Sequence, residues 1–222
     1  MNCRYCHCRP VYRFAGRCKV LTESGYPNLD EFGIYDGISE TIVTTMKGSL
    51  PNAAPIGIIR KEGRVFVRLF KGSITYFNVH SERVLVANVV NDPVIFVRST
   101  FSNLKESDFN YVSVEGHKFP VLKDALSWVV FECSSIKVTS EALVAELNPL
   151  HAHVNQSPVQ APNRGFNAVL EAAVHATRYK LSNDEKYLKL IHAYSAIVSR
   201  CGGKREKIAI NMLNDCLKKL KM

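Results

Sequence analysis

The chain has 222 residues, 46% of them hydrophobic and 22% charged, which is the composition of a globular protein with one sizeable core. No apolar run reaches the roughly 18 residues that a membrane-spanning helix needs. The net charge of +9 is uneven, because residues 1–22 carry +5 and residues 163–222 carry +7, which leaves −3 for the residues between. A basic tail favours nucleic acid or acidic partners, but lysines on the outer face of a helix are more often only solvated.

Residues 1–36 are predicted to form a basic, poorly ordered N-terminal extension outside the fold. Cys3, Cys6 and Cys8 cluster there around His7, and such short spacings suit metal ligands. A second pair of ligands at a suitable spacing is missing, so we predict no metal site. Seven cysteines are an odd number without a regular disulfide framework, which favours a reducing, cytoplasmic location.

The first two strands are predicted at residues 40–45 and 53–59, where β-branched and apolar residues are enriched. Gly48, Pro51 and Asn52 supply the turn between them. The next apolar strand covers residues 65–70.

The segment after this third strand has the composition of an anion site. Lys71 supplies a cation, Gly72 lets backbone amides approach an anion closely, and Ser73 caps a short helical turn. Thr75 adds a second hydroxyl near the start of that turn, where the amides of a helix N-terminus favour phosphate. The alternative is an ordinary surface turn, since the same residues dominate turns generally. We predict a phosphate seat at residues 71–75.

The helical turn is expected to continue through residue 78, and residues 84–90 form a further strand that stops before Pro93, which cannot donate to a β-ladder. Residues 101–110 are polar and are predicted to be a loop, the best candidate for a lid. A short strand is compatible with residues 110–114.

The run SWVVFEC at residues 127–133 is apolar on both faces, which is typical of a strand buried in a barrel or at a subunit interface. His117 precedes it in a turn and is a candidate for a place near the site. The alternative is that His117 is only a surface residue.

Residues 148–162 contain three prolines and no Asp, Glu, Lys or Arg, which predicts a linker. His151 and His153 could chelate a metal as a pair, but no acid or cysteine lies near them in the sequence. We therefore predict no metal there.

Three amphipathic helices are predicted beyond the linker. The second begins with a capping box from Ser182 to Glu185 and ends at Gly202 and Gly203. The apolar face of the first helix is expected to comprise Phe166, Val169, Leu170, Ala173, Val174 and Thr177. Its polar face is expected to comprise Arg164, Asn167, Glu171, His175 and Arg178. That polar face is either solvated or forms a wall over a bound ligand, and the pattern alone does not distinguish the two.

Four motifs occur in a fixed order: NAAPIGI, GSITYFNV, VANVVNDP and GHKFPVLKDALSWVVFEC. In this order they resemble the flavin-reductase type of FMN-binding split barrel. More closely, they resemble an uncharacterised prokaryotic family of that fold with a helical C-terminal segment, over roughly residues 35–217. The resemblance implies an α+β fold in which a split β-barrel at residues 37–147 is followed by the linker and a three-helix segment at residues 163–222.

The same resemblance implies FMN as the cofactor, with the predicted phosphate seat holding its phosphate, and a homodimer with flavin at the subunit boundary. Small side chains suit a flat isoalloxazine, because its heteroatom edge needs backbone N–H and C=O groups within reach. The predicted cofactor-binding residues are Asn52, Ala53, Ala54, Pro55, Phe70, Lys71, Gly72, Ser73, Thr75 and Asn78. For the two alanines, the alternative is a place in the core.

Two classes of function remain open. The first is an oxidoreductase of unknown substrate in which FMN carries the redox chemistry, so that no catalytic acid or base need occur in the sequence. The second is a non-catalytic protein, either an FMN carrier or a nucleic-acid-binding β-barrel with a basic tail. Nucleic acid is disfavoured, because no basic run is interleaved with stacking aromatics. One compact phosphate seat without a GxGxxG fingerprint favours FMN over FAD.

Overall fold

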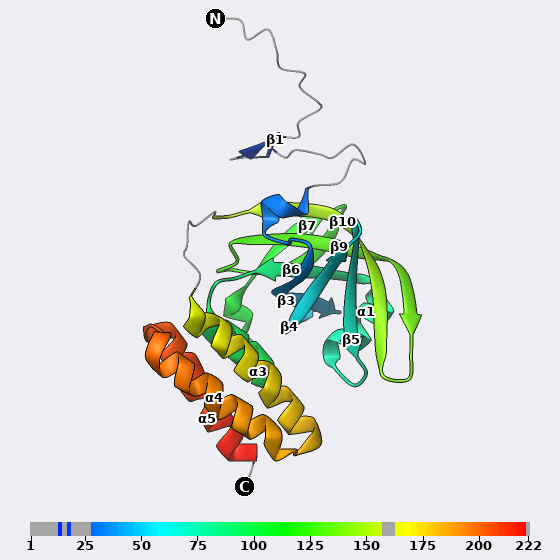
Figure 1. The fold of residues 1–222 in the computed structure, drawn as a ribbon. Helices are drawn as coiled ribbons and strands as arrows, with labels where there is room; N and C mark the ends of the chain where they lie inside the picture. Colours follow the sequence, from blue (N-terminus) through cyan, green and yellow to red (C-terminus); the bar gives the residue numbers. More distant parts are fainter. Residues whose placement is uncertain (1–12, 15–16, 19–27, 157–162, 221–222) are drawn as a thin grey trace, which may run out of the picture.

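The structure is a computed structural model that describes residues 13–14, 17–18, 28–156 and 163–220. Six antiparallel strands form a closed barrel in the order β10-β5-β4-β3-β6-β9 (Figure 1). The barrel strands are β3 (Gly37–Lys47), β4 (Leu50–Lys61), β5 (Arg64–Phe70), β6 (Val84–Val89), β9 (Ser127–Val138) and β10 (Ala142–Val154). Two small sheets accompany it: β1 (Arg13–Phe14) with β2 (Arg17–Cys18), and β7 (Phe109–Val114) with β8 (His117–Leu122).

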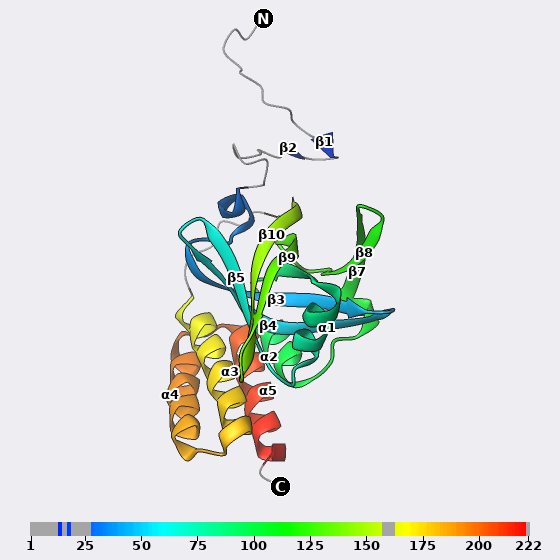
Figure 2. The ribbon, with the colours of Figure 1, turned by 90° about the vertical axis from the view of Figure 1, so that its right-hand side faces the viewer.

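The C-terminal helices are α3 (Arg164–Ser182), α4 (Glu185–Cys201) and α5 (Lys204–Leu220). They lie side by side at one side of the barrel in both views (Figures 1 and 2). The predicted fold class, an α+β split barrel followed by three helices, is confirmed. Among the described residues, no helix is long and apolar enough to cross a membrane.

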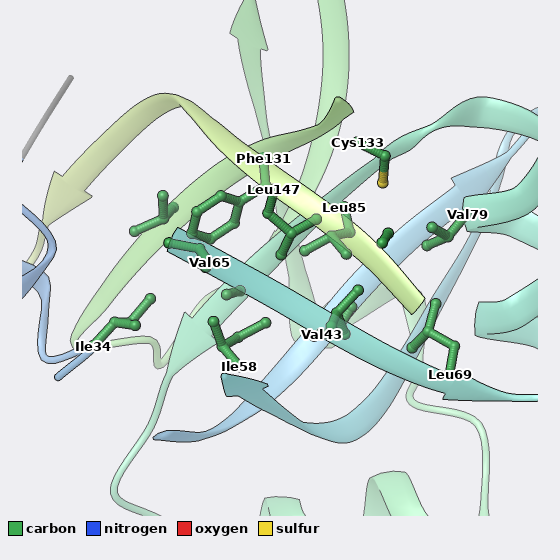
Figure 3. Close-up of a cluster of buried hydrophobic side chains, with 14 of the residues drawn as sticks. Ile34, Val43, Ile58, Val65, Leu69, Val79, Leu85, Phe131, Cys133 and Leu147 are labelled. Atoms are coloured by element: carbon green, nitrogen blue, oxygen red, sulfur yellow. The ribbon is translucent and has the colours of Figure 1, made fainter. Parts of the chain in front are cut away.

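The barrel interior is filled by the inward-facing residues of its strands (Figure 3). Val43, Ile58, Leu85 and Phe131 come from four different strands and are fully or almost fully buried. Because side chains alternate across a strand, the neighbours of these residues point outward. The outward set forms a second apolar cluster, which includes Ile42, Val86 and Val130 and is covered by the β7–β8 hairpin.

A buried asparagine links the hairpin to the barrel. The side-chain amide of Asn88 donates to the carbonyl oxygen of Ile42 over 2.9 Å, and its oxygen accepts from the backbone N–H of Leu122, also over 2.9 Å. Thr44 adds a hydrogen bond from its hydroxyl to the carbonyl oxygen of Pro120. These bonds satisfy polar groups that burial would otherwise leave unpaired.

Helix α1 (Ile74–Glu82) begins at the predicted cap, Ser73, and contacts β3, β4 and β5. Its residues Tyr76 and Val79 are buried in the barrel core, so the helix closes one end of the barrel.

A second internal helix, α2 (Pro93–Phe101), was not predicted. The strand does stop before Pro93, but Pro93 then occupies the first turn of a helix capped by Asp92, a position that does not require its missing N–H. Phe96 packs into the outer barrel cluster and Val97 into the core of the C-terminal helices. Helix α2 therefore lies between the barrel and the C-terminal helices. The loop predicted at residues 101–110 is shorter than expected, because the 3-10 turn η2 (Glu106–Asp108) and the start of β7 occupy part of it.

Residues 28–36 correct the prediction for the N-terminal extension. The 3-10 turn η1 (Leu29–Phe32) buries Leu29 and Phe32, and Ile34 follows them into the barrel core. These three apolar residues were overlooked because they form no strand-length run. Cys3, Cys6, Cys8 and His7 lie outside the described residues.

The predicted linker at 148–162 is wrong over its first half. Strand β10 continues to Val154, and Pro149 is accommodated where the register to β9 shifts between Pro149 and His151. A bulge tolerates proline because a ladder hydrogen bond is already missing there. His151 and His153 pack beside the Trp128 ring, with centroids 5.5 and 5.6 Å away. Residues 157–162 lie outside the described part of the chain.

Two details of the helical segment also differ from expectation. Ser182 is the last residue of α3, and Asp184 caps α4 through a 2.9 Å hydrogen bond from the N–H of Lys186. The buried face of α3 is rotated from the predicted one, because the small residues of α3 pack in one cluster with residues of α4 and α5. Its buried residues are Gly165, Ala168, Val169, Ala172, Ala173, His175, Ala176 and Tyr179.

Candidate functional site

A cluster of polar side chains lies where α1 meets the barrel. The amide of Asn52 on β4 donates to the Thr75 hydroxyl over 3.0 Å, and the amide of Asn78 donates to the Thr45 hydroxyl over 3.0 Å. Asn52 and Thr45 are themselves cross-strand partners. The cluster thus joins two predicted segments, around residue 52 and residues 71–78, which are about 20 residues apart in the chain.

The turn that leads into α1 contains the residues predicted to form the phosphate seat. The Ser73 hydroxyl accepts a hydrogen bond from the N–H of Tyr76 over 3.1 Å and lies 3.0 Å from the carbonyl oxygen of Phe70, to which it donates. Gly72 has a φ of +86°, a left-handed conformation that glycine adopts without strain, and open space surrounds the position of a Cβ. Lys71 is exposed and has no ion pair with any described residue. The first amides of α1 have no partner within the helix, as at any helix N-terminus.

Burial divides the predicted cofactor-binding residues between 71 and 78 into two groups. Lys71, Gly72 and Ser73 reach the surface, whereas Thr75 and Asn78 are buried beneath them and are engaged with Asn52 and Thr45. In this structure Thr75 and Asn78 therefore support the turn from below. Phe70 lies beside the turn with its ring largely exposed.

The strand at residues 52–55 presents its side chains to two different environments. Asn52 faces α1, as its bond to Thr75 shows, whereas Pro55 lines a cleft beneath α2 and α3. Ala53 is buried in the outer apolar cluster, which favours the core alternative for this residue, and Ala54 is half-buried. Because successive side chains of a strand point to opposite faces of the sheet, these four side chains cannot all face one ligand.

Sequence reasoning missed Thr44 and Thr45. Both line a cavity of about 430 Å³ between the barrel and the β7–β8 hairpin, and His117 and Lys118 of the hairpin line it as well. The signal was present in the consecutive hydroxyl residues of the motif ETIVTTM, which place one hydroxyl on each face of a strand. His117, the sequence candidate, thus lies in the same cavity as Thr45, a member of the polar cluster.

The polar face predicted for the first C-terminal helix is divided by the structure. Asn167 and Glu171 line the cleft that Pro55 also lines. His175 instead points toward α4, where its ring stacks between Tyr187 and Tyr194 at centroid distances of 5.9 and 5.6 Å. Its Nδ1 atom is buried without a hydrogen-bond partner, and burial together with the Arg178 charge lowers the pKa of the imidazole.

A closed barrel of six antiparallel strands, with a helix-capped turn beside it and a separate helical segment, defines an α+β barrel protein. Two family models match the chain: "Protein of unknown function (DUF447) N-terminal domain" over residues 39–156, and "Protein of unknown function (DUF447)" over residues 163–215. The chain belongs to the DUF447 family. The resemblance to an uncharacterised split-barrel family is thereby confirmed.

Two relatives illustrate the family. An uncharacterised protein of Methanocaldococcus jannaschii is 27% identical over 186 residues, which cover 77% of this chain and 93% of that protein. The crystal structure of an FMN-bound DUF447 protein of Methanosarcina mazei is 54% identical, with a TM-score of 0.82, and covers 85% of this chain and 100% of that one.

Proposed function

We propose that this protein is an FMN-binding flavoprotein and that it acts as an oxidoreductase. The observation that carries the proposal is its 54% identity with a family member whose structure holds FMN, at a TM-score of 0.82. At this similarity the main chain of a cofactor site is expected to be shared. The flavin supplies the redox chemistry when bound, and the protein binds and orients it.

The turn at Lys71, Gly72 and Ser73 supports this assignment from the chain's own chemistry. An exposed lysine, a glycine in the left-handed region and the N-terminus of a helix follow one another in the chain at this turn. This combination suits a phosphate dianion, which accepts several charge-assisted hydrogen bonds. We assign the FMN phosphate to this turn and the isoalloxazine to the neighbourhood of Asn52.

The cofactor itself provides the test. We expect purified protein to show a flavin absorbance spectrum and to release FMN on heating, identified by its mass. Release of FAD, or no flavin after incubation with FMN, would contradict the proposal. An oxidoreductase should also let a reduced nicotinamide bleach the bound flavin anaerobically faster than free FMN, whereas a pure carrier should not.

We further propose that the working unit is a homodimer with the flavin at the subunit boundary. Four apolar side chains around the predicted seat are each more than half exposed: Leu50, Phe70, Ile74 and Phe77. An exposed apolar group of this kind usually marks an interaction surface. A second copy of the chain would cover these side chains and shield the flavin from water.

A further inference from the structure

A second cleft, of about 340 Å³, lies between the barrel and the C-terminal helices. Residues of strands β3 and β4 line one side, and residues of helices α2 and α3 line the other. Six of the lining residues determine its chemistry: Glu40, Pro55, Phe96, Asn167, Leu170 and Glu171. The volume lies within the range of small-molecule sites, at the kind of boundary between structural units where such sites often occur.

The cleft combines apolar side chains with two exposed carboxylates, those of Glu40 and Glu171. Neither Glu40 nor Glu171 forms an ion pair with any described residue, and both line the same space. Partial burial and the nearby charge of Glu171 raise the pKa of the Glu40 carboxyl.

The barrel makes room for one of these carboxylates. Gly57 is the cross-strand partner of Glu40, and a Cβ at this position would lie 2.6 Å from Ile38 Cγ2 and 3.4 Å from Glu40 Oε1. Any larger residue would therefore push the Ile38 and Glu40 side chains aside. Glycine at residue 57 allows the Glu40 side chain to lie across β4 at the mouth of the cleft.

From this geometry we propose that the cleft binds a small organic cation, an ammonium or guanidinium group attached to an apolar body. Glu40 and Glu171 receive the cationic group, Asn167 offers an amide beside it, and Phe96, Leu170 and Pro55 contact the apolar part. A divalent metal ion fits less well, because Mg²⁺ and Ca²⁺ prefer six or more oxygen ligands and gain nothing from apolar walls. The proposal concerns a site apart from the turn at Lys71 and does not depend on FMN binding.

The test uses the full chain, with phenethylammonium as the probe and 2-phenylethanol as its neutral counterpart. We expect phenethylammonium to bind with millimolar affinity by calorimetry and the alcohol to bind at least about tenfold more weakly, because a charge-assisted contact typically contributes a factor of that order. Amide shift changes in NMR spectra should centre on the residues that line the cleft.

Matched variants separate this site from general electrostatics. Glu40→Gln and Glu171→Gln should each weaken phenethylammonium binding about tenfold, and Glu171→Lys, which supplies an internal cation, should abolish it. Glu62→Gln removes the same charge from an exposed turn outside the cleft and should leave the affinity unchanged. FMN affinity should be the same in all four variants.

Three results would overturn the proposal: no binding of phenethylammonium at millimolar concentration, equal binding of the alcohol, or an affinity that responds to Glu62→Gln as much as to the cleft variants. Each can be obtained whether or not the protein holds FMN, so failure here is distinguishable from failure of the flavin proposal. Circular dichroism of each variant establishes that the fold is retained.

Discussion

At the scale of single residues, most polar groups near the predicted site already form hydrogen bonds within the protein, and one side chain does not. The Ser73 hydroxyl is already engaged as the helix cap, with bonds to Tyr76 and Phe70, and Thr75 is engaged with Asn52. Among the predicted polar ligands, only the Lys71 side chain forms no hydrogen bond or ion pair with a described residue, and it is exposed. The phosphate should therefore depend most on the Lys71 ammonium and on the amides of the helix start.

The first prediction follows from this free ammonium. Lys71→Ala should weaken FMN binding by roughly ten- to a hundredfold, the expected effect of losing one charge-assisted contact. Riboflavin lacks the phosphate, so its affinity should hardly change. Fluorescence titration with both ligands measures this, and Lys207→Ala on α5 serves as an exposed-lysine control. Equal losses for FMN and riboflavin would mean that Lys71 supports the ring or the fold instead.

The second prediction concerns His175, which is 9% exposed between two tyrosine rings. Its pKa in the folded protein is lowered from the ordinary 6.5 by burial and by Arg178, while the Glu171 charge acts in the opposite direction. The unfolded chain therefore takes up this proton first as the pH falls. The stabilising effect of neutral His175 is complete above about pH 6.5 and is lost as the pH falls from there through the lower folded pKa.

His175→Phe retains a ring between Tyr187 and Tyr194 but cannot titrate. We expect this variant to lose less free energy of unfolding between neutral and mildly acidic pH than the unchanged protein does, as measured by urea denaturation. The exposed His192 on α4 provides the control, since His192→Gln should leave the pH dependence as it was. A His175→Phe curve parallel to that of the unchanged protein would refute the assignment.

At the scale of elements, the start of α3 and the end of α4 meet through two glycines. A Cβ on Gly165 would lie 2.5 Å from the Cα and 2.8 Å from the backbone nitrogen of Gly202, and the backbone cannot rotate away as a side chain can. The same closeness suits the three alanines, Ala168, Ala172 and Ala176, that join the predicted Val169 and Ala173 in the buried face of α3. The small residues set how closely the two helices approach.

The third prediction tests that contact. Gly165→Ala should lower the free energy of unfolding by about 1–3 kcal/mol, the usual cost of overpacking, despite alanine's better helix propensity. Gly203→Ala is the matched control, because its Cβ would meet only Glu206 Oε2, at 3.2 Å, at the end of a flexible side chain. Chemical denaturation of both variants measures the difference, and equal stability of the two would show that the helices can separate without cost.

At the scale of the whole molecule, α2 connects the two parts. It contacts β4 on one side and α3 and α5 on the other, and Arg205 of α5 forms an ion pair with Asp92 at its N-cap. The exposed apolar group of Leu50, Phe70, Ile74 and Phe77 lies elsewhere, around α1 and the adjoining strand ends. The helical segment and the proposed dimer surface are therefore separate features of the molecule.

The fourth prediction is that the protein sediments as a homodimer at micromolar concentration. Phe77→Glu places a charge in the proposed interface and should shift the population to monomer and weaken FMN binding with it. Leu181→Glu changes an even more exposed apolar residue, at the end of α3, and should leave the dimer intact. A monomer that still holds flavin would contradict the proposed arrangement.

Sequence patterns were sufficient to predict those structural features that depend only on residues a few positions apart in the chain. Runs of β-branched and apolar residues predicted the barrel strands at 40–45, 53–59 and 65–70, and Ser73 was predicted as the cap of the helical turn that follows. Both signals are local properties of the chain. The order of the four motifs was sufficient for the family and the fold class.

Which of these residues meet depends on tertiary packing. The pairing of Asn52 with Thr75, the burial of Ile34 and the placing of Glu40 opposite Glu171 all join distant segments, so they depend on how the barrel closes and how α3 rotates against it. Pro149 remained inside a strand for the same reason, since the bulge that accommodates it is a property of two strands in register. Local periodicity sets which face of an element is apolar, but the partner that covers this face is determined by packing across the whole chain.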